Sequence, residues 1–66
     1  MSEPLAHIRH AKILGYCAKG LRQFFTIHGL DYLQFVRHGI PEHLIWDTGD
    51  ELARRIVLEA RKERGE

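Results

Sequence analysis

Apolar residues along the chain recur at spacings of three and four, which is the period of an amphipathic helix. The pattern is strongest between residues 17 and 28. One face of this segment carries Cys17, Leu21, Phe24, Phe25 and His28, and the other carries Lys19, Arg22, Gln23 and Thr26. We therefore expect a central helix over residues 17–28 with its apolar face against the core.

Three glycines mark the predicted ends of helices. Gly15, Gly29 and Gly39 each follow a helix-compatible run and precede an apolar residue. In the Schellman motif a glycine in the left-handed conformation closes the helix, and the apolar residue after it packs back on the last turn. This predicts positive φ at Gly29 and Gly39, with His28 and His38 as the last residues of their helices.

Further elements follow from local signals. Asp31 is a suitable N-cap for a short helix ending at His38, and Pro41 favours one or two more turns after it. Residues 5–14 fit either a short helix or a strand. We favour the helix, because a lone strand here would have nothing to pair with.

The last helix is predicted over residues 49–62. The preceding sequence Thr48-Gly49-Asp50-Glu51 matches the capping box, in which Thr48 and Glu51 satisfy each other's backbone N–H groups. Its apolar residues again recur at helical spacing, with acidic residues in the first turn and basic ones in the last, as the helix dipole favours.

Together these elements predict an all-α fold, a compact bundle of four to five short helices. A chain of 66 residues can form only one domain, here residues 1–66, and we expect residues 1–4 and 63–66 to fray. The predicted core consists of Leu14, Leu21, Phe24, Phe25, Leu30, Phe35, Val36, Ile40, Leu52, Ile56 and Val57.

Cysteine content and charge indicate in which compartment the protein works and which classes of partner it can bind. Cys17 is the only cysteine, so no intramolecular disulfide can form, which suits a reducing cytoplasm. No apolar run approaches the ~18 residues of a membrane span, and no signal peptide is recognisable, so we expect no membrane association. The net charge of +1 combines basic residues 1–28 with acidic residues 29–53, which argues against a strongly cationic nucleic-acid protein but allows a local basic patch.

Neither metal chemistry nor catalysis is predicted. The chain has five histidines, but no His-Glu-x-x-His motif and no acid in register to complete a three-ligand site. Cys17 lies near the start of the central helix, where a thiol can be activated, yet no base or oxyanion donor can be assigned to it. We interpret Cys17 as a small buried residue, and expect no catalytic residue, no cofactor, no metal and no enzymatic activity.

Gly20 is unusual because a glycine inside a helix costs about 1 kcal/mol relative to alanine. Something should therefore pass close to it. The neighbour is either the backbone of another helix of the same chain or a partner that approaches from outside.

Two surfaces are candidates for binding. Residues 8–28 can be read as a helix-turn-helix-like unit, with a nucleic-acid surface made of Arg9, Lys12, Lys19, Arg22, Gln23 and Thr26. The alternative is a protein-binding patch of Leu33, Trp46 and Leu58, of which Leu58 lies off the apolar stripe of its helix. Trp46 could equally cover the core beside the last helix.

Several short motifs are similar to a family. The segments Leu14-Gly15-Tyr16-Cys17-Ala18, His28-Gly29-Leu30-Asp31, Gly39-Ile40-Pro41 and Thr48-Gly49-Asp50, with Gly20, Arg22, Phe24-Phe25 and Phe35, resemble a pattern in small uncharacterised proteins encoded by prophages and tailed phages. The likeness covers residues 8–60. It implies a phage-derived protein in the host cytoplasm and implies no activity or functional residue.

The sequence thus favours a non-catalytic interaction module that binds another protein, in phage assembly or in control of a host process, with self-association as one form of that binding. A small DNA-binding regulator is the alternative.

Overall fold

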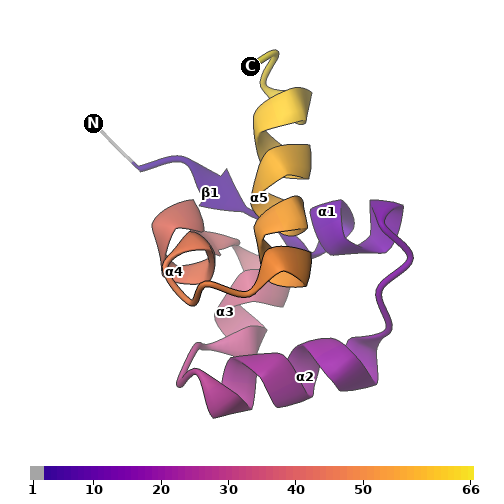
Figure 1. Ribbon diagram of the computed structural model, residues 1–66, viewed down its shortest axis with the longest axis vertical. Coiled ribbons are helices and arrows are strands. Elements are labelled where there is room, and N and C mark those ends of the chain that lie inside the picture. Colours follow the sequence, from indigo (N-terminus) through magenta and orange to yellow (C-terminus); the bar gives the residue numbers. More distant parts are fainter. Residues whose placement is uncertain (1–2) are drawn as a thin grey trace.

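The computed structural model describes residues 3–66, which form five helices and one pair of short strands (Figure 1). The elements in chain order are β1 (Leu5–Ala6), α1 (Ile8–Ile13), α2 (Ala18–Ile27), α3 (Tyr32–Arg37), β2 (Ile40–Pro41), α4 (Glu42–Trp46) and α5 (Glu51–Glu63). α1 and α4 pack along α5, whereas α2 packs on α3 at the other end of the molecule. The fold is mostly helical, as predicted, although it is not purely so.

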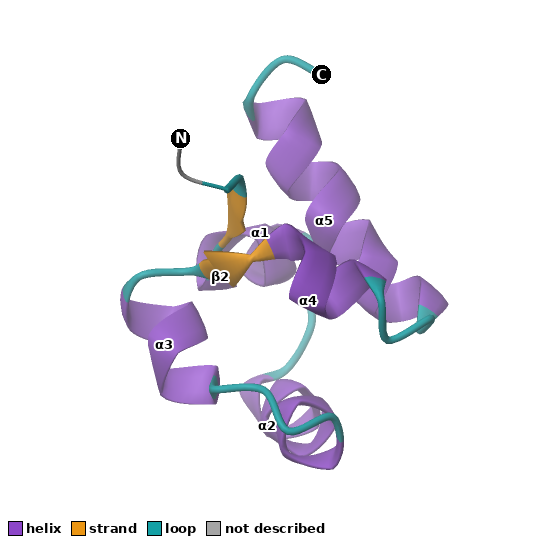
Figure 2. Cartoon of the chain, turned by 90° about the vertical axis from the view of Figure 1, so that its left-hand side faces the viewer, coloured by secondary structure: helices purple, strands orange, loops and turns teal. Residues whose placement is uncertain are grey.

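The prediction of a helix at the start of residues 5–14 was wrong for the first two of them. β1 pairs antiparallel with β2, with Leu5 opposite Pro41 and Ala6 opposite Ile40 (Figure 2). A strand was not expected at Leu5–Ala6 because no neighbouring segment could pair with it. The actual partner comes after α3, and local periodicity cannot detect such a pairing.

The predicted helix ends are confirmed at Gly29 and Gly39, whose φ angles are 67° and 85°. α2 closes with the full Schellman pair, in which Leu30 N–H donates to Phe25 C=O at 2.7 Å and Gly29 N–H donates to Thr26 C=O at 3.2 Å.

The stop at Gly39 differs from the one at Gly29. Gly39 N–H donates to Gln34 C=O at 2.9 Å, and the next residue, Ile40, enters β2 instead of folding back in a second Schellman bond. His28 and His38 occupy the C-cap positions of α2 and α3, close to where they were predicted.

The predicted capping box of the last helix was wrong. Asp50 is the N-cap of α5, and its side chain accepts a hydrogen bond from Ala53 N–H at 3.0 Å. The Thr48 hydroxyl instead donates to Ile45 C=O at 2.8 Å, which closes the end of α4. Gly49, with φ of 79°, makes the turn between the two helices and so delays the start of α5.

At the other end, α5 continues to Glu63 and closes on Gly65 with the same motif as α2. Glu66 N–H donates to Arg61 C=O at 2.9 Å. The fraying of residues 63–66 stays a prediction. Of the N-terminal residues predicted to fray, Met1 and Ser2 lie outside the described part of the chain.

The core gathers around Phe25, whose ring lies 4.7 Å from Phe35 and 5.6 Å from Tyr32 between centroids. The fully or nearly buried apolar residues are Ala6, Ala11, Leu21, Phe25, Phe35, Ile40, Ile45, Ala53, Ile56, Val57 and Ala60. Two predicted core residues are exposed, Val36 by 42% and Leu52 by 57%. Ile45 and several alanines are buried instead, and the small side chains of Ala53 and Ala60 let neighbouring elements approach α5 closely.

Candidate functional site: an apolar groove between α2 and α5

A groove with a volume of about 330 Å³ runs between the first turns of α2 and α5. Its α2 wall consists of Cys17, Gly20, Leu21 and Phe24, which share one helix face because they are spaced i, i+3, i+4 and i+7. Its other lining residues are Tyr16, Asp50, Leu52, Ala53 and Ile56. We call this the α2–α5 groove.

The polar groups of the groove are already committed within the chain. The Tyr16 hydroxyl donates to Leu52 C=O at 2.9 Å and so ties the two walls together. Gly20 N–H donates to the Cys17 sulfur at 3.4 Å, and the Asp50 carboxylate accepts from Ala53 N–H. The remaining surface is apolar and open, which suits an apolar side chain better than a polar ligand.

Gly20 leaves the groove open. A Cβ at this position would meet only Cys17 Sγ, at 3.3 Å, and no neighbouring backbone lies near it. The close internal helix contact offered as one reason for Gly20 is therefore absent among the described residues. The one contact that a Cβ would make is a tight one with the N-cap sulfur, and the missing side chain also leaves more room in the groove.

Cys17 is exposed, contrary to the prediction that it is buried. It is the N-cap of α2, with extended backbone and its sulfur accepting the Gly20 N–H bond. The helix thus begins one residue later than expected, and the side chain turns to the rim of the groove.

Three acidic residues, Asp47, Asp50 and Glu51, lie in and just after the loop into α5, and Asp50 is the one that lines the groove. All three are exposed, and in residues 3–66 none forms an ion pair. Nearby Arg54 does not neutralise them. Its guanidinium lies over the Trp46 ring, 4.7 Å from the centroid, and its Nε donates to Trp46 C=O.

Five of the six residues of the predicted nucleic-acid surface are exposed without an ion pair to the described residues, whereas Arg9 is bound to Glu63. Lys19, Arg22, Gln23 and Thr26 are exposed on α2, and Lys12 is exposed on α1. Arg9, in contrast, donates two hydrogen bonds to Glu63, at 2.6 and 2.8 Å. α1 packs mainly on α5 and α2 mainly on α3, so the two helices do not form the mutually packed pair of a helix-turn-helix unit.

The residues of the predicted protein-binding patch come from three different helices, α3, α4 and α5. Leu33 is 62% exposed on α3, which packs on α2, and Leu58 is 50% exposed on α5. Trp46 is half-buried against the core, and Arg54 and Arg61 both lie over its ring. This position agrees with the alternative that Trp46 covers the core beside the last helix.

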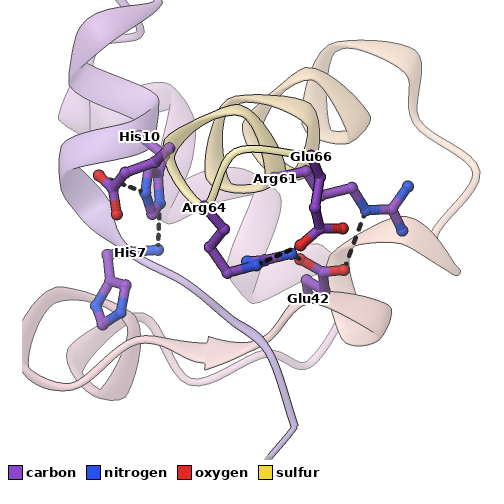
Figure 3. Close-up of polar contacts among 7 residues, drawn as sticks. His7, His10, Glu42, Arg61, Arg64 and Glu66 are labelled. Atoms are coloured by element: carbon purple, nitrogen blue, oxygen red, sulfur yellow. Dashed lines mark hydrogen bonds and ion pairs between the residues drawn. The ribbon is translucent and has the colours of Figure 1, made fainter.

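A buried histidine connects the two ends of the described chain. His10 is 1% exposed, and its Nδ1 accepts from His7 N–H at 2.9 Å (Figure 3). Nδ1 therefore carries no proton in this arrangement, and the proton of a neutral ring lies on Nε2. Nε2 is 3.1 Å from Glu63 Oε2 but off the line of a good hydrogen bond, so the contact is electrostatic.

This cluster lowers the pKa of two of its members. The hydrogen bonds from Arg9, with further help from His10, lower the pKa of Glu63 to about 2. Partial burial, together with the charge of Arg9 and the proximity of His10, lowers the pKa of His7. The cluster is a connection between α1 and α5.

A second polar cluster holds α4 against α5. Glu42 is 8% exposed, and its two carboxylate oxygens accept from Arg61 at 3.1 Å and from Arg64 at 3.0 Å (Figure 3). Arg64 also pairs with Glu66. A buried carboxylate without these partners would be costly, so this cluster is part of the fold.

Within residues 3–66, no three His, Cys, Asp or Glu side chains come together in a way that could hold a metal ion. No helix in this part of the chain combines the length and apolar character needed to cross a membrane.

Sequence reasoning missed the groove itself. Tyr16 was not singled out, and Leu52 was assigned to the core. The one usable signal was Gly20, whose cost within a helix had no explanation in the sequence.

Comparison with protein-family models, with curated proteins and with solved structures finds no match to this chain.

Proposed function

We propose that this chain is a non-catalytic protein-interaction module that receives an apolar side chain of a partner protein in the α2–α5 groove. The observation that carries this proposal is the groove, whose polar groups are committed internally and which Gly20 keeps open. A small hydrophobic pocket of this kind is a typical anchor point for a buried side chain at a protein interface.

The setting we propose is the cytoplasm of a bacterial host, in phage assembly or in control of a host process. The phage origin rests on the resemblance of its short motifs to a pattern in small phage-encoded proteins. The cytoplasmic location is supported by the single cysteine.

DNA binding is the second candidate. It is supported by the exposed basic residues of α1 and α2, of which Lys12, Lys19 and Arg22 form no ion pair in the described part of the chain. We rank it lower because Arg9 is occupied by Glu63 and because α1 and α2 do not pack on each other.

The protein-binding proposal can be tested with a displayed library of random peptides. Wild-type protein should enrich peptides that carry a large apolar anchor, and Gly20→Leu should lose them because its side chain fills the groove. Gln23→Leu is the matched control, since it adds the same side chain to an exposed position of the same helix. Circular dichroism should show both variants folded.

Enrichment of the same peptides by Gly20→Leu would contradict the proposal. So would a wild-type selection that yields no specific peptide.

A further inference from the structure

We propose that the partner segment bound in the α2–α5 groove carries a lysine or arginine beside its large apolar anchor, and that this cation pairs with Asp50. The inference rests on the proposed function, since it names the chemistry of the partner that occupies the same groove.

Asp50 is the only charged residue among those that line the groove. As the N-cap of α5 it uses one carboxylate oxygen, Oδ1, which accepts Ala53 N–H at 3.0 Å. The residue is exposed, and its carboxylate forms no ion pair within residues 3–66. Because an ionised carboxylate can accept several hydrogen bonds, Asp50 can still receive a donor from a bound partner.

The chain itself supplies no cation to this carboxylate. Arg54 follows Asp50 by four residues, a spacing at which helical side chains can pair. Its guanidinium instead lies over the Trp46 ring, 4.7 Å from the centroid, and its Nε donates to Trp46 C=O. No lysine or arginine lies among the residues that line the groove. The groove therefore combines apolar walls with one acid whose charge is not paired.

This combination favours a partner that is apolar and basic over one that is apolar and acidic. The apolar anchor would be buried against walls that include Leu21, Phe24 and Ile56, and it would supply most of the affinity. The neighbouring cation would fix the orientation of the segment, whereas an acid in its place would meet Asp50 with like charge. The gain from the cation should be modest, because Asp50 is exposed and lies at the positive end of the α5 dipole.

The peptide selection described above supplies the probe. Peptides that the wild type enriches should carry lysine or arginine close in sequence to the apolar anchor more often than the unselected library does. One of them, synthesised with a fluorophore, is the basic peptide, and a second version with glutamine in place of its basic residue is the neutral peptide. Fluorescence anisotropy gives the dissociation constants of both.

Asp50→Asn is the decisive variant, because it removes the charge and asparagine caps a helix about as well as aspartate. At low salt it should weaken binding of the basic peptide by about two- to fivefold, the range of an exposed ion pair, and leave binding of the neutral peptide unchanged. Added salt should reduce the difference by screening.

Asp31→Asn is the matched control. It makes the same change at the N-cap of α3, where Asp31 accepts Gln34 N–H at 3.0 Å and does not line the groove. This variant should bind both peptides like the wild type, and thermal melting should show both variants folded.

Enriched peptides without a basic residue near the anchor would overturn the inference. So would an Asp50→Asn variant that binds the basic peptide unchanged, that loses both peptides equally, or that is matched in its loss by Asp31→Asn. If Asp50→Asn does not fold, equal affinity of the wild type for the two peptides overturns the inference instead. In each of these cases, peptides that are lost by Gly20→Leu leave the proposed function standing, whereas a selection without any specific peptide would overturn both.

Discussion

Gly39 is the residue at which two steric demands coincide. Its φ of 85° lies in the left-handed region, as it does for Gly29 at 67°. Around Gly29 there is open space, but a Cβ at Gly39 would lie 2.6 Å from His7 Cε1 and 2.9 Å from the Ala6 carbonyl oxygen. The helix stop after α3 and the approach of β1 to β2 therefore depend on the same missing side chain.

Replacing each of these two glycines by alanine should separate the cost of the left-handed backbone from the cost of the clash with His7 and Ala6. Gly29→Ala should cost about 1 kcal/mol of unfolding free energy, the strain of a left-handed alanine. Gly39→Ala adds a clash with backbone that cannot move freely and should cost at least about 3 kcal/mol. Urea denaturation measures both values. Equal costs at the two positions would show that the contact with His7 and Ala6 contributes nothing.

The histidines show what a sequence can and cannot reveal about single residues. Their places at the ends of α2 and α3 were predictable because the glycine that follows is a local signal. The burial of His10 was not, since it depends on contact with Glu63, which lies 53 positions later in the chain (63 − 10).

At the level of elements, the start of α5 distinguishes two capping arrangements. In the structure Asp50 caps the helix, and Thr48 belongs to the turn before it. Asp50→Ala should therefore lower the unfolding free energy by about 1 kcal/mol, the usual value of an N-cap. Glu51→Ala should cost about half of that or less, through the helix dipole alone. Thermal melting of the two variants gives the comparison, and a larger loss for Glu51→Ala would restore the capping box.

Helices were predictable here because each is encoded by neighbours in sequence. The apolar face of α2 and the N-cap Asp31 lie within a few residues of the turns that they determine. β1 and β2 could not be found in this way, because each consists of two residues whose hydrogen-bonding partners lie on the far side of three helices. The groove was hidden for the same reason, since its two walls come from distant segments.

For the molecule as a whole, pH should change stability in two separate ranges. Folding lowers the pKa of His7 below its usual 6.5, so the unfolded chain binds a proton at this imidazole more readily than the folded chain does. The free energy of unfolding should therefore fall as the pH drops below about 6.5. Glu63 contributes stability above its usual pKa of 4.5, and this contribution should disappear as pH falls toward about 2.

Melting temperatures measured from pH 8 downwards test both steps. His7→Gln should remove the step in the histidine range and keep the acid step, and Glu63→Gln should do the reverse. Each variant is thus the control for the other. A histidine-range step that persists in His7→Gln would assign it to another residue.

The ion pair between Arg9 and Glu63 also has a consequence for the order of folding. It joins residues 54 positions apart, and the strand pair and the contacts of α1 with α5 also connect segments that lie far apart in the sequence. Such non-local contacts slow folding relative to helical proteins with mainly local contacts, because a long loop must close before they form. A nascent chain could make α2 and α3 early, but it could not dock α1 until the segment carrying Glu63 had left the ribosome.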